Sequence, residues 1–160
     1  MNGEQEEKVF DVGDSVFYPM HGVGIVESIE EKDMLGERAK YYILRFITSK
    51  LTAMVPVASA DSVGLRPVID SSECEKIFDA AAVCAESENW NQRYRDNLAK
   101  LKGGDIYDVA DVIKCLKRRD SLKGLSAGDR KMLITARQVL SAELSAASGR
   151  DIDEIRDIIG

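Results

Sequence analysis

Residues 41–57 read YYILRFITSKLTAMVPV, and this stretch decides the fold class of the first half of the chain. Residues 41–47 are rich in β-branched and aromatic residues, and residues 48–50 form a short polar connection into a second apolar run, which predicts a β-hairpin. Residues 10–18 and 22–30, which precede this stretch, are also typical of strands. Short strands with tight turns favour a small SH3/Tudor-like β-barrel over residues 1–68.

The pattern becomes helical after Pro67. Apolar residues recur at three- and four-residue spacing, and capping residues or glycines stand at the ends of each run. The predicted helices occupy residues 70–84, 89–102, 105–120, 126–147 and 151–158. The sequence therefore predicts an α+β, multidomain protein in which the N-terminal barrel (1–68) is followed by a C-terminal all-α helical bundle (69–160).

Charge is distributed unevenly along the chain. The net charge is −6, but residues 1–75 hold 7 basic against 14 acidic residues, whereas residues 90–137 hold 12 basic against 6 acidic ones. This asymmetry predicts two surfaces with different partners, although a solvated helical face can also be basic. Residues 1–7 lack the apolar run of a signal peptide, and no run is long enough to span a bilayer, so we expect a cytoplasmic protein without membrane contact.

The sequence carries no recognisable catalytic centre. His21 is the only histidine and has no cluster of metal-ligating residues around it, which favours a turn histidine over a metal ligand. Residues 22–24 begin like a dinucleotide-binding loop, but Glu27 stands where the third glycine belongs. The three cysteines lack CxxC spacing, and we expect reduced thiols. We therefore expect no enzyme, metal, cofactor or small-molecule substrate.

Trp90, the only tryptophan, opens the basic helix predicted at residues 89–102. Helical spacing puts it on one stripe with Tyr94 and Leu98, which favours burial in the bundle. Arg93 and Arg95 flank that stripe, as phosphate-binding residues would flank an apolar wedge inserted into nucleic acid. The residues alone leave both interpretations open.

Further basic residues follow on the next predicted helices. Arg118 and Arg119 lie near the end of the third helix, and Arg130 and Lys131 lie in the first turn of the fourth. Cations at a helix N-terminus oppose the macrodipole, and a bound anion would explain them. So broad a basic face predicts salt-sensitive binding that tolerates changes of nucleic-acid sequence.

Four stretches together resemble the CarD/CdnL family of bacterial RNA polymerase-binding transcription regulators. They are residues 12–24, 51–57, 90–98 and 125–133. The resemblance extends over residues 9–147. The first stretch alone is also similar to the barrel of transcription-repair coupling factors.

The resemblance implies that the barrel binds the RNA polymerase β subunit, in its protrusion/lobe region, by edge-strand addition. The polymerase contacts that it implies are Lys32, Lys50, Thr52, Met54 and Val55. In some relatives an arginine stands at the position of Met54, so a more apolar contact is expected here.

The resemblance also implies that the helical domain contacts promoter DNA just upstream of the −10 element, with Trp90 as a wedge that stabilises the open complex. The DNA contacts that it implies are Trp90, Arg93, Arg95, Arg118, Arg119, Arg130 and Lys131. Gln92 stands where a basic residue can occur. On this hypothesis Trp90 is partly exposed, and full burial would contradict it.

Two alternatives stay open. The chain could be an adaptor that binds peptide or RNA, for example at the ribosome. Alternatively, the barrel could be the binding module and the bundle purely structural.

Overall fold

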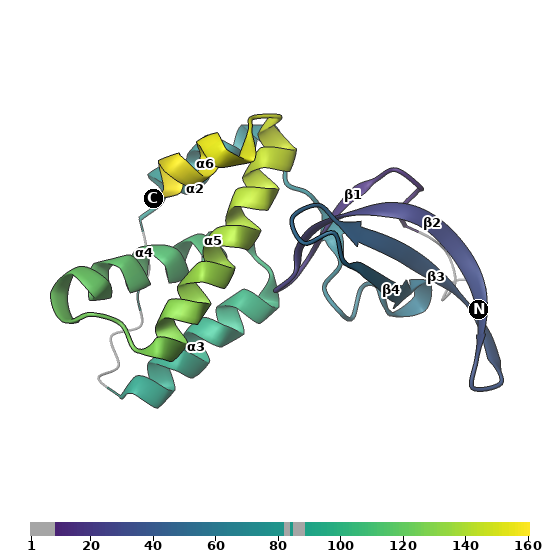
Figure 1. The fold of residues 1–160 in the computed structure, drawn as a ribbon, viewed down its shortest axis with the longest axis horizontal. Helices are drawn as coiled ribbons and strands as arrows, with labels where there is room; N and C mark the ends of the chain where they lie inside the picture. Colours follow the sequence, from purple (N-terminus) through teal and green to yellow (C-terminus); the bar gives the residue numbers. More distant parts are fainter. Residues whose placement is uncertain (1–8, 82–83, 85–88) are drawn as a thin grey trace. The chain divides into compact units, whose positions relative to one another are not determined.

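The computed structural model describes residues 9–81, 84 and 89–160. The chain divides into two compact units, which we call the β unit (Met1–Val68) and the helical unit (Ile69–Gly160) (Figure 1). The predicted α+β class is confirmed, because an antiparallel sheet is followed by a set of helices.

The sheet of the β unit has five strands in the order β4-β3-β2-β1-β5. Their bounds are Ser15–Tyr18 (β1), Gly22–Met34 (β2), Glu37–Phe46 (β3), Thr52–Pro56 (β4) and Arg66–Pro67 (β5). The sheet is open, since no pairing joins β4 to β5 among the described residues. Pro56 and Pro67 end these two strands and lack the amide hydrogen that a ladder bond would need.

The core of the β unit collects alternate residues of neighbouring strands. Val26 on β2, Tyr42 on β3 and Val55 on β4 are almost fully buried. The Tyr42 hydroxyl accepts hydrogen bonds from the amides of Val9 (2.8 Å) and Phe10 (3.2 Å). The buried hydroxyl is therefore satisfied, and the segment before β1 is held on the sheet.

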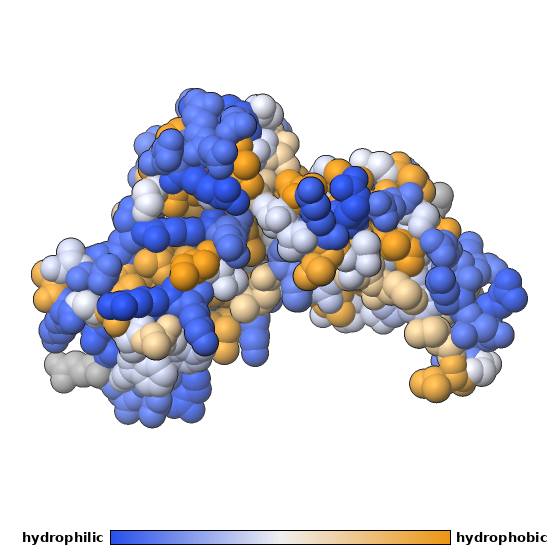
Figure 2. All heavy atoms as spheres, viewed as in Figure 1, coloured by the Kyte–Doolittle hydropathy of each residue, from blue (hydrophilic) through white to orange (hydrophobic). Residues whose placement is uncertain are grey.

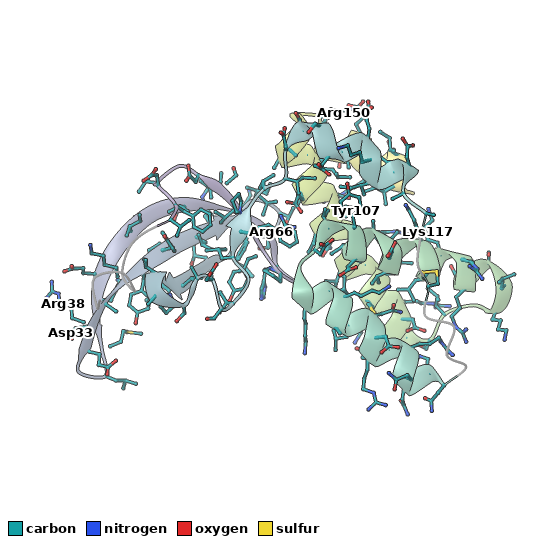
Figure 3. The ribbon with its side chains drawn as sticks, turned by 180° about the vertical axis from the view of Figure 1, so that it is seen from behind. Asp33, Arg38, Arg66, Tyr107, Lys117 and Arg150 are labelled. Carbon is teal, nitrogen blue, oxygen red and sulfur yellow. A yellow bond between two sulfur atoms is a disulfide. The ribbon has the colours of Figure 1, made fainter. Side chains whose placement is uncertain are left out.

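Strands β2 and β3 continue past the other strands as a two-stranded arm (Figure 1). The register shifts between Val26 and Ser28, and the paired residues Asp33 and Arg38 lie near the end of the arm (Figure 3). At its tip Met34 and Leu35 are exposed, and apolar spheres mark the tip in Figure 2.

The helical unit contains five α-helices among the described residues. Their bounds are Cys74–Asp79 (α2), Trp90–Gly103 (α3), Ile106–Lys123 (α4), Ala127–Ser148 (α5) and Ile152–Ile159 (α6), with short 3-10 turns at Val57–Ser59 (η1, in the β unit) and Ser71–Glu73 (η2). Asn89, Asp105, Ser126 and Asp151 cap the last four helices by accepting hydrogen bonds from first-turn amides. The predicted starts of these helices are confirmed.

Helix α5 is the centre of the helical unit and contacts α3, α4 and α6 (Figure 1). Ala136, Leu140 and Leu144 of α5 are buried, as are Val109 and Val112 of α4. Their spacing of three or four residues places them on one face of each helix, and they form the core that fixes the positions of the helix ends. None of the helices in the described residues is both long and apolar enough to span a bilayer.

The predicted end of the first helix of this unit and the predicted state of two cysteines are wrong. Helix α2 ends at Asp79 instead of extending to Cys84, because Ala80 is extended and the Lys114 ammonium binds the Ile77 and Ala80 carbonyls at the helix end. Reduced thiols were predicted for all three cysteines, and Cys74 is free, but Cys84 forms a disulfide with Cys115 of α4, with a Cα–Cα distance of 5.6 Å. The absence of a CxxC motif gave no information on cysteines that folding brings together across 31 residues.

Candidate functional site

Trp90 lies at the first turn of α3 and is 40% exposed, as the wedge hypothesis requires. Its indole nitrogen donates hydrogen bonds to Ser126 Oγ (3.1 Å) and Asp129 Oδ2 (3.2 Å). Both acceptors belong to the N-terminus of α5. The ring is therefore partly open to solvent while its polar edge is fixed to a second helix.

The support beneath Trp90 is itself a helix cap. Ser126 is the N-cap of α5, and its Oγ accepts from the Asp129 amide (3.1 Å) as well as from the indole. The Asp129 carboxylate is only 3% exposed and lies in the first turn, where the helix macrodipole favours negative charge. The orientation of the indole is thus tied to a feature that α5 needs for its own start.

Aromatic packing fixes the plane of the Trp90 ring. Its centroid lies 5.1 Å from that of Tyr94, with an interplanar angle of 28°. A Cβ atom on Gly128 would lie 3.3 Å from Tyr94 Cε1 and 3.4 Å from Trp90 Cζ2. Glycine at this position allows both rings to pack directly on the backbone of α5.

The contacts from Ser126, Gly128 and Asp129 to Trp90 were missed in the sequence. The spacing of Ser126 and Asp129 predicted a capping box, but nothing local connects that box to a tryptophan 36 to 39 residues earlier. The one indication in the sequence is that the capping box of Ser126 and Asp129 comes directly before the basic pair Arg130 and Lys131.

The predicted DNA-binding cations fall into two groups. Arg130 and Lys131 are exposed and follow Asp129 directly, and Arg95 is exposed on α3, where its Nη2 lies 3.4 Å from Gln92 Oε1. These residues lie along the chain next to Trp90 or to its support. Arg93 is half-buried on α3.

The second group lies on the last two turns of α4, where Arg118 is exposed and Arg119 is half-buried. Other cations of α4 have structural roles. Lys114 binds the end of α2, and Lys117 Nζ donates to the Ile159 carbonyl (2.8 Å) (Figure 3). The basic face of α4 is therefore narrower than its sequence indicates.

The predicted polymerase contacts cluster on the edge strand β4. Thr52 is exposed, Met54 is 42% exposed, and Val55 is 2% exposed with its side chain in the core. The Phe46 amide donates to the Leu51 carbonyl (2.9 Å), and bonded pairs alternate with non-bonded ones in an antiparallel ladder. The main-chain groups of Thr52 and Met54 consequently point away from β3, towards the open edge.

The other two predicted contacts lie elsewhere in the β unit. Lys50 is exposed in the turn before β4, with a φ of 60°. Lys32 lies on the arm opposite Ala39, beyond the point where β4 stops pairing, and its ammonium lies 3.3 Å from Glu30 Oε1. The Ser28 hydroxyl and Lys32 hold the pKa of Glu30 below its usual value.

The described residues contain no group of three or more His, Cys, Asp or Glu side chains that could hold a metal ion. His21 packs between aromatic rings, with its centroid 4.9 Å from that of Tyr18 and 5.8 Å from that of Phe46. This environment is that of a turn histidine, in which the imidazole contributes packing.

Family models match both units of the chain. The CarD-like/TRCF RID domain matches residues 10–69, and the CarD C-terminal domain matches residues 76–160. The RID match implies interaction with RNA polymerase. A Bacillus subtilis (strain 168) protein named "Putative transcription factor YdeB" is 39% identical over 144 residues, which cover 88% of this chain and 94% of that protein. The chain belongs to the CarD family of transcription factors, which are not enzymes.

Proposed function

We propose that the chain stabilises the open promoter complex of bacterial RNA polymerase, in the cytoplasm, by presenting Trp90 as a wedge to DNA just upstream of the −10 element. The observation that carries this proposal is a 40% exposed indole whose nitrogen is bonded to Ser126 and Asp129. The indole is thus held in a fixed position while part of its ring stays accessible to a ligand.

A fixed ring is suited to insertion between bases. Apolar wedges unstack a base step at a cost of a few kcal/mol, which contacts with the deformed DNA must offset. Tyr94, Ser126 and Asp129 already hold the indole in one orientation. Binding DNA therefore loses little of the free energy that ordering a side chain costs at other interfaces.

Exposed cations next to Trp90 supply the second part of the DNA contact. Arg95, Arg130 and Lys131 reach phosphates beside the wedge, and Arg93, Arg118 and Arg119 supply further phosphate contacts. Phosphate contacts position a protein without reading sequence, so this surface binds DNA in a salt-dependent way with little base preference.

The β unit brings this surface to the promoter by docking on the protrusion/lobe region of the polymerase β subunit. Strand β4 is an edge strand, and the outward main-chain groups of Thr52 and Met54 can pair with a strand of the partner. The exposed side chains of Lys50, Leu51 and Met54 border that edge. Val55 supports it from the core, and Lys32 contacts the partner from the arm.

The mechanism is thermodynamic. A protein that binds melted DNA more tightly than closed DNA shifts the equilibrium by its differential affinity. A difference of about 1.4 kcal/mol yields about tenfold more open complex when opening is unfavourable.

Substitution of the wedge tests the proposal. We expect Trp90→Ala to shorten the lifetime of the open complex on a slow-opening promoter about tenfold, since stacking of one aromatic ring on a base contributes about 1–3 kcal/mol. Competitor-challenge lifetimes with purified polymerase measure this effect. Trp90→Phe keeps an apolar ring and should retain part of the lifetime.

Binding to polymerase without DNA is the control, and it should be unchanged in both variants. A wild-type lifetime for Trp90→Ala would contradict the wedge. A loss of polymerase binding in that variant would mean that Trp90 acts through docking instead.

A further inference from the structure

A cavity of about 210 Å³ lies between α5 and α6 in the helical unit. Its lining residues come from both helices and are Ile134, Arg137, Gln138, Ser141, Arg156 and Ile159. The two isoleucines make part of the wall apolar, while two arginines give it positive charge. None of these residues belongs to the proposed DNA or polymerase surfaces.

Two of the lining residues each have a buried polar atom without a hydrogen-bond partner among the described residues. Ser141 is 0% exposed, and its Oγ is unpaired, as is the buried Nε of Arg137. The two residues are four positions apart on α5, so they lie on the same face of the helix. A buried polar group without a partner is costly, and such groups in native structures are satisfied by ordered water, an ion or another bound group.

The charge of the cavity selects the kind of ligand. No carboxylate pairs with Arg137 among the described residues, whereas Arg156 Nη1 lies 3.1 Å from Asp153 Oδ1 in an exposed ion pair. Arg137 is therefore the main source of uncompensated positive charge at the wall. Guanidinium groups bind carboxylate and phosphate oxygens through charge-assisted hydrogen bonds.

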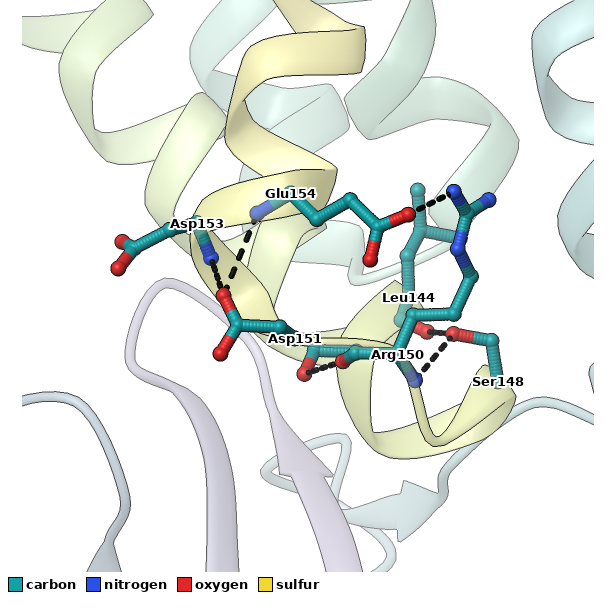
Figure 4. A network of polar contacts seen from close by, with 7 residues as sticks. Leu144, Ser148, Arg150, Asp151, Asp153 and Glu154 are labelled. Atoms are coloured by element: carbon teal, nitrogen blue, oxygen red, sulfur yellow. Dashed lines mark hydrogen bonds and ion pairs between the residues drawn. The ribbon is translucent and has the colours of Figure 1, made fainter.

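The wall that α6 contributes is fixed at both of its ends. At the start of the helix, Asp151 caps the first turn and Arg150 pairs with Glu154, in the network that Figure 4 shows. At its end, Lys117 of α4 binds the Ile159 carbonyl (2.8 Å). The cavity is thus largely preformed, as is usual for sites that take small molecules.

We propose that this cavity binds a small organic anion whose carboxylate or phosphate contacts Arg137 and Ser141 and whose apolar body packs on Ile134 and Ile159. Liquid water occupies about 30 Å³ per molecule, so the cavity has room for about seven groups of that size. A six-carbon carboxylate fits this volume.

The test uses the full-length chain without polymerase or DNA, so that its result is independent of the proposed transcriptional function. Hexanoate is titrated into protein carrying labelled isoleucine methyl groups, and NMR shifts are followed. We expect saturable shifts at Ile134 and Ile159 with a Kd of about 1 mM, a typical value for so few ligand atoms. Hexanol and inorganic phosphate, which each lack one half of the ligand, should bind at least about tenfold more weakly.

Two variants locate the binding. Arg137→Gln and Ser141→Ala should each weaken hexanoate binding, the first about tenfold because it removes a charge-assisted contact. Arg38→Gln, which changes an exposed arginine of the β unit outside the cavity, is the matched control and should bind hexanoate as wild type does.

Non-saturable shifts, equal binding of hexanol, or wild-type affinity in both cavity variants would each overturn the proposal. Melting curves establish that the variants are folded. Ser141→Ala, which removes only one oxygen, gives a result even if Arg137→Gln is unstable.

Discussion

The edge of β4 and the surface around Trp90 are two exposed regions that are built in opposite ways. At β4 the groups available to a partner are main-chain donors and acceptors, and the side chains beside them vary from the exposed Met54 to the buried Val55. At Trp90 the group available to a partner is a side chain, and its position depends on Tyr94, Ser126 and Asp129. The first region can tolerate side-chain changes that the second cannot.

A proline in β4 would test the main-chain half of this comparison and should have the largest effect. Met54→Pro removes an outward amide, and prolines are tolerated on edge strands, so the fold should persist. We expect binding to the polymerase β lobe to weaken at least about tenfold, because a partner carbonyl loses its donor. Biolayer interferometry with the isolated lobe measures this.

Met54→Ala is the matched control, since it removes the side chain and keeps the amide. It should weaken binding much less than Met54→Pro. Equal losses in both variants would show that β4 docks through its side chains, and the contrast with the Trp90 surface would fail.

Removing the acceptor beneath the indole tests the other half. Asp129→Ala leaves Trp90 with Ser126 as its acceptor, and one hydrogen bond is worth about 1 kcal/mol, so the open complex should decay about fivefold faster. Because Trp90 is the only tryptophan, its fluorescence anisotropy reports the added motion directly.

Asp108→Ala provides the control for this experiment. Asp108 holds the same place relative to its N-cap in α4 as Asp129 does in α5, but Asp129 alone contacts the tryptophan. Unchanged anisotropy in Asp129→Ala, or equal changes in both variants, would contradict the idea that Asp129 positions the ring.

A smaller effect is expected from one cation beside the wedge. Arg95→Gln should reduce the slope of log affinity against log salt by about 0.9 on forked promoter DNA, because one phosphate contact is lost. Fluorescence polarisation over a salt series measures the slope. Arg38→Gln, on the arm of the β unit, should leave it unchanged, and an equal decrease would place DNA on both units.

The smallest effect concerns a hydrogen bond between α4 and η2 in the helical unit. The Tyr107 hydroxyl of α4 donates to Glu73 Oε2 of η2 (2.6 Å) (Figure 3). This bond lowers the pKa of Glu73, with a further contribution from Lys76, and raises the pKa of Tyr107. The stabilisation from Glu73 is present above its ordinary pKa and is lost as pH falls through the lowered one. The stabilisation from Tyr107 is present below its ordinary pKa and is lost as pH rises through the raised one.

Tyr107→Phe should therefore be less stable than wild type between about pH 5 and about pH 9, with the difference vanishing towards both extremes. Thermal melts over a pH series measure this difference in stability. Glu73→Gln should remove the part of the pH dependence that lies at acidic pH. A difference that is independent of pH would mean that the hydroxyl contributes packing alone.

The sequence predicted those features whose causes are local. Asn89, Asp105, Ser126 and Asp151 were identifiable as helix starts because a cap acts on amides two or three residues away. The strand hairpin at residues 41–57 was identifiable because two runs rich in apolar and β-forming residues are joined by a short polar connection.

Features that depend on distant partners were not predictable. The end of α2 is set by Lys114, which is 34 residues beyond the Ala80 carbonyl that it binds. The contact between Trp90 and Asp129 spans 39 residues and produces no periodic pattern in the sequence. The open edge of the sheet likewise depends on how β4 and β5 end relative to one another in space.

The Cys84–Cys115 bond has a topological consequence for the whole helical unit. It closes a covalent ring that contains all of α3, so Trp90 lies on a closed loop from which the rest of the chain leaves as two tails. A single protease cut within α3 would leave the molecule in one piece on a non-reducing gel and in two pieces after reduction. The wedge helix is thus attached to its unit through covalent bonds on both sides, and cutting one side does not release it.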